Sequence, residues 1–189
     1  ILRVNNGAIF LNGYSNQGNT SSDSIYLNNS SYIESTGTGT LIIDGNNDEI
    51  SADSSSYIKI ANLLLQNGFT TTLTNANNDI ETLAATGMTN LTYSDLNELT
   101  IGSVGGVSGI TATGDVIISA LDIFVNETIS NGSNILDLNA SGNIYYDLNE
   151  PTNKESTNKE STNTDTSSII SENTYYTIND LPTSDNINT

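Results

Sequence analysis

Short apolar runs alternate with polar, turn-forming segments along residues 1 to 149. The runs are about four to seven residues long, are rich in β-branched and aromatic residues, and are flanked by pairs such as Asn6-Gly7 and Asn131-Gly132. This pattern predicts strands separated by turns, because helices need longer runs with a period near 3.6. Only ANLLLQN (61–67) tolerates a helix, and it is short. The predicted strands include AIFL (8–11), TLII (40–43), YIKI (57–60), LTI (99–101), DVIIS (115–119) and NIYY (143–146).

Several of these runs share a small unit, which reads glycine, a small or polar residue, three apolar residues and a polar residue. It begins at Gly7, Gly39, Gly114 and Gly142. Gly7 and Gly39 lie 32 residues apart and Gly114 and Gly142 lie 28 apart, which suits one coil of a β-solenoid. A coil cannot bury its apolar face alone, so coils must stack. We therefore predict an all-β fold, a right-handed parallel β-helix of about five to seven coils over residues 1–149.

The character of the chain changes after this region. Residues 150–168 are polar, rich in Ser, Thr and Asn, and contain the direct repeat KESTN-KEST. We predict a linker or loop there. Residues 169–189 contain short strand-like runs, IISENTYYTI among them, followed by a tail that we expect to be mobile.

Composition excludes several classes of function. The 22 acidic residues against 4 basic ones give a net charge of -18, which disfavours nucleic acid and anionic membranes as partners. Cysteine and histidine are absent, which excludes disulfides, thiolate zinc sites and Ser-His or Cys-His catalytic pairs. No apolar run is long enough to form a transmembrane segment, and the start of the chain lacks the pattern of a signal peptide. We therefore expect a mature or internal piece of a longer exported protein.

The stretch from residue 77 to 120, and above all LTIGSVGGVSGITATGDV (99–116), resembles large bacterial exoproteins of the filamentous haemagglutinin type. The resemblance covers about residues 70–149. It implies a right-handed β-helix exported by a two-partner or autotransporter-like route, with a role in adhesion or biofilm formation at the surface of a Gram-negative bacterium. The Asn-Pro-Asn motifs of that family's secretion domain are missing, since Pro151 and Pro182 follow Glu150 and Leu181. No catalytic residues are carried over, because the matching positions are structural.

One loop carries residue types suited to a metal ion. Asp44, Asn46 and Asp48 alternate and Glu49 follows, so four oxygen-bearing side chains could face Ca²⁺. The rest of an EF-hand loop is lacking, because Ser55 stands where the twelfth-position Glu would be. These four residues are weak calcium candidates, and a solvated turn is the simpler interpretation. No other cofactor is expected.

Two enzymatic interpretations are also open to the residues. GSVGGVSG (102–109) is glycine-rich like a phosphate-binding loop, but a strand rather than a helix follows it and no basic residue is near, which favours a turn between strands. A glycosidase would need two carboxylates about 5 to 10 Å apart in an aromatic groove. The available acids, which mostly neighbour turn residues, are Asp44, Asp48, Asp79, Glu81, Asp95, Asp115 and Asp122.

The leading prediction is a non-catalytic structural or adhesive segment, a stalk or rod, of a secreted bacterial surface protein. Its expected partners are further repeats or copies of the same protein and surface glycans or proteins. One alternative is a self-assembling extracellular fibre subunit that donates residues 169–178 as a strand to a neighbour. Another is a polysaccharide-active β-helix enzyme.

Overall fold

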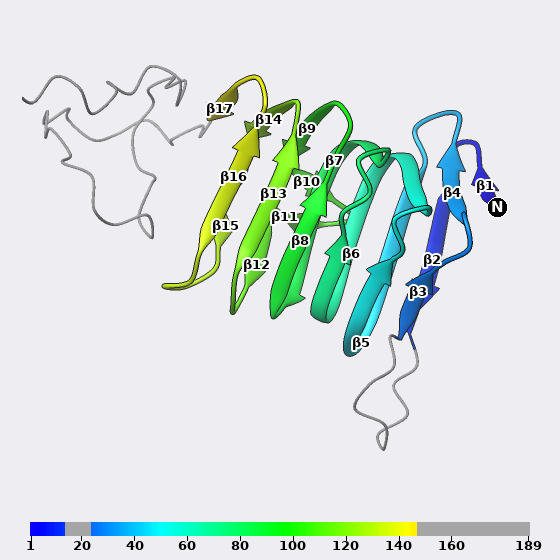
Figure 1. Cartoon of the computed structure of the whole chain (residues 1–189), viewed down its shortest axis with the longest axis horizontal. Helices are drawn as coiled ribbons and strands as arrows, with labels where there is room; N and C mark the ends of the chain where they lie inside the picture. The colour runs from blue at the N-terminus through cyan, green and yellow to red at the C-terminus, as the bar shows by residue number, and fades with distance from the viewer. Residues whose placement is uncertain (14–23, 147–189) are drawn as a thin grey trace, which may run out of the picture.

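A computed structural model describes residues 1–13 and 24–146 as a single stack of β-strands (Figure 1). No helix occurs in these two ranges. The strands are β1 (Leu2–Val4), β2 (Ala8–Asn12), β3 (Ile25–Leu27), β4 (Tyr32–Ser35), β5 (Thr40–Ala52), β6 (Tyr57–Leu73), β7 (Asp79–Met88), β8 (Asn90–Ser94), β9 (Glu98–Ile101), β10 (Ser103–Val104), β11 (Val107–Ser108), β12 (Ile110–Ala112), β13 (Val116–Ala120), β14 (Asp122–Val125), β15 (Ile129–Ser130), β16 (Leu136–Ala140) and β17 (Ile144–Tyr146). The runs named above for residues 1–149 coincide with these strands, except that Asp115 and Asn143 directly precede β13 and β17, and residues 61–67 lie inside β6 rather than in a helix.

The strands form a β-solenoid of about 6 turns, which confirms the predicted fold class. Strand pairing between successive turns is parallel throughout the large sheet. The strands therefore rise turn by turn from β1 at one end of the stack to β17 at the other (Figure 1). They begin and end within the predicted solenoid region of 1–149, whereas the predicted segments 150–168 and 169–189 lie outside the described residues.

The core consists of inward-facing columns, in which one residue per turn, apolar in every case but Thr71, lies against its counterpart in the next. What we call the first inner column is Ile9, Leu41, Leu63, Leu83, Ile101, Val125 and Tyr146. The second inner column is Ile25, Ile50, Thr71, Leu91, Val116 and Leu136. In the middle turns these side chains are fully buried. Each buried Leu, Ile or Val contributes about 1.5 to 3 kcal/mol relative to leaving it in water, so the stacked columns dominate the stability.

The registers correct part of the predicted repeat. Gly7 and Gly39 do occupy equivalent places, because Thr40 N donates to Gly7 O and Ala8 pairs with Thr40. Gly114 and Gly142 do not. Gly114 leads into β13, which pairs with β8 and β16, whereas Gly142 leads into β17, which pairs with β14. Both runs have an apolar strand after glycine, but they lie on different sides of the coil.

The corners between the two sides are built from residues that tolerate a left-handed backbone. Asn46, Asn47 and Asn67 have φ values of 51°, 65° and 51°. Asn adopts this region more readily than most residues because its short polar side chain bonds to nearby backbone. These Asn residues mark the corners at which β5 and β6 bend, and the register between the two strands shifts there, between Asp44 and Ile50.

Candidate functional site

The calcium-candidate loop forms a corner inside β5. Asp44 Oδ1 accepts hydrogen bonds from Asn46 N at 2.9 Å and from Asn67 Nδ2 at 3.1 Å, and Asp48 Oδ1 accepts one from Glu49 N at 2.9 Å. Two of the candidate oxygens are thus engaged with the protein itself. Within the described ranges, no three or more acidic side chains gather in a group that could hold a metal ion. Calcium binding by Asp44, Asn46, Asp48 and Glu49 stays a prediction.

Asp115 and Asp122 bind the backbone of the following turn. Asp115 Oδ1 accepts from Ile135 N at 3.1 Å, and Asp122 Oδ1 accepts from Asn143 N at 2.6 Å. Asn90 does the same one turn earlier, since its Oδ1 accepts from Asp115 N at 2.9 Å. A backbone N–H at a corner has no strand partner, so a side-chain oxygen from the neighbouring turn satisfies it. These carboxylates therefore hold successive turns together.

Asp53 and Asn75 each form a turn at a corner. In both turns the side-chain oxygen accepts a hydrogen bond from the backbone N–H two residues further along the chain. Asp53 Oδ1 accepts from Ser55 N at 3.0 Å, and Asn75 Oδ1 accepts from Asn77 N at 2.9 Å. Hydrogen bonds from the Ser55 hydroxyl, then Ser56, lower the pKa of Asp53 from 3.8 to about 2. The corners therefore repeat one structural solution along the stack.

Asp95 is the acid most removed from water among these candidates. It is 7% exposed, and its Oδ2 accepts from the Tyr93 hydroxyl at 2.8 Å and from Ile80 N at 3.1 Å. Its Oδ1 accepts from Asn97 N at 3.0 Å. Burial raises the pKa of Asp95, and burial followed by the Asp95 charge raises that of the Tyr93 phenol well above its usual value. Through these three hydrogen bonds, Asp95 holds the corner between β8 and β9.

Asp79 belongs to a charge ladder on the outside of the stack, which sequence analysis missed. Arg3 pairs with Glu34, Glu34 with Lys59 and Lys59 with Asp79 in successive turns, so the charges alternate in sign. Arg3 and Glu34 form an ion pair, as do Lys59 and Asp79 at 2.5 Å. Both basic residues of the described ranges lie in this ladder. The irregular lengths of the turns hid it, because no fixed sequence spacing links its members. The remaining candidate acid, Glu81, is exposed on β7.

Aromatic side chains stack on the same principle, one above another in neighbouring turns. The rings of Tyr32 and Tyr57 lie 5.1 Å apart and are parallel to within 1°. The Arg3 guanidinium lies 6.0 Å from the centre of the Tyr32 ring, within cation–π range. Phe124 and Tyr145 stack at 4.7 Å near the other end. Because strands lie about 4.8 Å apart, aligned rings meet face to face.

The glycine-rich segment 102–109 forms a β-hairpin. β10 and β11 pair antiparallel, and Gly105 and Gly106 make the turn with φ values of 61° and 87°, which favour glycine. The segment is thus the turn between strands that the sequence analysis favours over a phosphate-binding loop. Val104 of this hairpin packs on Leu64 and Ala84, which form an apolar cluster on the outer face, separate from the main core. The hairpin therefore covers an apolar strip that sequence analysis did not identify.

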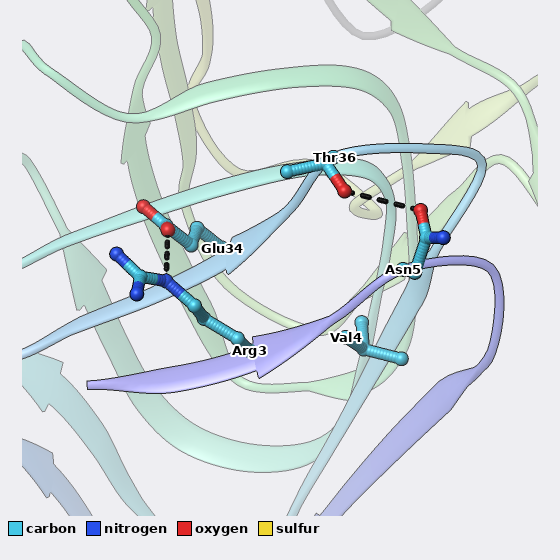
Figure 2. A pocket seen from close by; sticks show the side chains of 5 residues that line it. All are labelled: Arg3, Val4, Asn5, Glu34 and Thr36. Atoms are coloured by element: carbon cyan, nitrogen blue, oxygen red, sulfur yellow. Dashed lines mark hydrogen bonds and ion pairs between the residues drawn. The ribbon is translucent and has the colours of Figure 1, made fainter.

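A shallow hollow of about 190 Å³ lies beside β1, at the first turn of the stack (Figure 2). Figure 2 shows the Arg3 side chain reaching Glu34, and the Thr36 hydroxyl donating to Asn5 Oδ1 at 3.0 Å. Val4 also lines the hollow. Two pairs of its lining side chains thus bond to each other.

Comparison with known proteins identifies no relative. No protein-family model, curated protein or solved structure matches this chain. The resemblance to filamentous haemagglutinin-type exoproteins stays a prediction. Among the described residues, no helix has the length and apolar character needed to cross a membrane.

Proposed function

We propose that the chain is a non-catalytic structural segment, part of a rod, in a secreted bacterial surface protein that serves adhesion or biofilm formation. The proposal rests mainly on the hydrogen bonds that the described acidic side chains make. Asp44, Asp95, Asp115 and Asp122 all bond to the backbone or side chains of corners. A chain whose acids hold successive turns in place is suited to mechanical continuity along its axis.

The core supports the same role. Its inner columns run through the whole stack, so each turn contacts the turns before and after it and load passes along the axis through many parallel hydrogen bonds. The high negative charge, -18 over the chain, keeps such a surface soluble.

Surface location is tested with antibodies against the purified chain, applied to intact and to permeabilised cells of the organism that makes it. We expect labelling of intact cells, and loss of the label after brief protease treatment of the cell surface. Labelling that requires permeabilisation would contradict the proposed location. Adhesion is tested separately, by the retention of host and bacterial cells on beads coated with the chain, against beads coated with heat-unfolded chain.

The polysaccharide-active alternative has its own test. The purified chain is incubated with a panel of bacterial and host polysaccharides, and new reducing or unsaturated ends are measured. We expect none above the level given by heat-unfolded chain. Release of ends that disappears in Asp122→Asn or Asp79→Asn variants would replace the structural proposal with an enzymatic one.

A further inference from the structure

The β10–β11 hairpin lies outside the path of the solenoid coil. Ile101 pairs with Leu83 of the preceding turn. Ile110 pairs with Ala85 of that same turn. The eight residues between Ile101 and Ile110 therefore stand opposite a single residue, Ala84. The hairpin is thus an insertion at one position of the coil.

Hydrogen bonds close the coil beneath the hairpin. Gly109 N donates to Gly102 O at 2.9 Å, which holds the two ends of the insertion side by side. Gly102 N also donates to Leu83 O at 3.0 Å. Ala85 N donates to Gly109 O at 2.9 Å, so the ladder to the preceding turn continues past the insertion. The hydrogen bonds between turns are therefore complete without residues 103–108.

The hairpin lies on the outer face of the earlier turns (Figure 1), over a row of side chains that we call the outer apolar column. The members of this column are in register from turn to turn and are Phe10, Ile42, Leu64 and Ala84. Val104 packs on Leu64 and Ala84, which are 2% and 0% exposed. The turn of the hairpin reaches further, because a Cβ on Gly105 would lie 3.9 Å from Ile42 Cδ1. The hairpin therefore covers most of the column.

Few contacts hold the hairpin to the solenoid. Of residues 103–108, Val104 is buried, Val107 is half-buried and the other four are exposed. In the described ranges, one hydrogen bond joins these residues to another turn, from Ser103 Oγ to Glu127 Oε1 at 3.1 Å. One fully buried valine favours the closed position by roughly ten- to a hundredfold. A hairpin of two residue pairs is not stable in water by itself, so its own hydrogen bonds break when it lifts away.

We propose that residues 103–108 are a lid, which opens without unfolding of the solenoid and so controls access to the outer apolar column. Gly102 and Gly109 stay bonded to each other and to β7 while the residues between them lift away. Opening uncovers Leu64 and Ala84 and joins them to the rest of the column in one continuous apolar row. The inference goes beyond the proposed function and does not depend on surface location or adhesion.

Thiol labelling of the full-length chain tests the opening, because the sequence has no cysteine. Ala84→Cys places a thiol under the lid, and Ala85→Cys places the matched control in the inner core; both alanines are 0% exposed. The Ala84→Cys thiol should react about ten to a hundred times more slowly than in unfolded chain, at a rate that low urea hardly changes. The Ala85→Cys thiol should react at least tenfold more slowly still and should speed up steeply with urea, because the solenoid must open. Equal rates and equal urea dependence for the two thiols would overturn the proposal.

A second variant removes the lid from the full-length chain. Gly109 N and Gly102 O meet as the ends of a four-residue β-turn do, so an Asn-Gly pair in place of residues 103–108 should connect them. Circular dichroism should match the wild type, and the fluorescence of Nile red, an uncharged apolar dye, should rise severalfold. Leu64→Ser in the same background should reverse that rise. Loss of the folded spectrum would overturn the proposal, because the coil would then depend on the hairpin, and so would dye fluorescence equal to that of the wild type.

Discussion

Thr71 is the one polar side chain in the second inner column, and replacing it is expected to stabilise the protein. It lies between Ile50 and Leu91, is fully buried, and its Oγ1 has no hydrogen-bond partner among the described residues. A buried hydroxyl without a partner costs about 1 to 3 kcal/mol in mutational series. Valine has the same shape with a methyl group in place of the hydroxyl. Thr71→Val should therefore raise the free energy of unfolding by about 1 to 2 kcal/mol.

Urea unfolding followed by circular dichroism measures the change. The midpoint should rise while the slope with denaturant stays the same, because the surface exposed on unfolding hardly changes. For a chain of this size the melting temperature should rise by roughly 2 to 8 °C. Thr72→Val is the matched control: Thr72 lies on the opposite face of the same strand, in register with Ser51 and Thr92, and its change should stay within about 0.5 kcal/mol.

A loss of stability in Thr71→Val would refute the reasoning. It would mean that the hydroxyl has a partner in the folded chain, such as a buried water molecule, and that the inner columns hold a polar site. Equal gains in Thr71→Val and Thr72→Val would also refute it, because the gain would then reflect the strand preference of valine rather than burial.

Four further substitutions test the turns and corners. Gly109→Ala should destabilise the chain by more than about 3 kcal/mol, because its Cβ would lie 2.1 Å from a backbone oxygen, whereas Gly106→Ala, with a similar positive φ and open space, should cost about 1 kcal/mol in the same urea assay. Asp53 has its pKa lowered from 3.8 to about 2, so the stability that the wild type holds over Asp53→Asn should be present above pH 4 and disappear towards pH 2. Asp95 has its pKa raised, so the advantage of the wild type over Asp95→Asn should be greatest below pH 3.8 and decline as the pH rises; parallel pH profiles for the two variants would contradict both assignments.

The sequence predicts the strands and the solenoid because both depend on local information. Apolar runs such as 40–43 and 57–60 are short, rich in β-branched residues and bounded by corner residues. Both runs form strands in the structure, as predicted. The overlay of Gly114 on Gly142 fails for the same reason. A glycine before three apolar residues describes a strand start on either side of a coil, and only the pairing between turns tells the two sides apart.

The arrangements between turns lie beyond sequence reasoning of this kind. The strand register brings together Arg3, Glu34, Lys59 and Asp79, and because their turns differ in length, no constant spacing in the sequence reveals the charge ladder. The acids weighed as catalytic candidates, Asp122 among them, bond across turns to backbone groups that the sequence does not show as unpaired. Once the strand register is known, the charge ladder and these hydrogen bonds between turns can both be identified.

Distances between spin labels in one outer column test the stacked solenoid most directly. The chain has no cysteine, so cysteines introduced at Tyr26, Thr92 and Asp137 are the only labelling sites. Tyr26 lies three register steps from Thr92 and five from Asp137. At about 4.8 Å a step, double electron–electron resonance should give backbone separations of about 14 and 24 Å, in proportion to the number of turns. Equal separations, or a shorter distance for the Tyr26 and Asp137 pair, would contradict the solenoid.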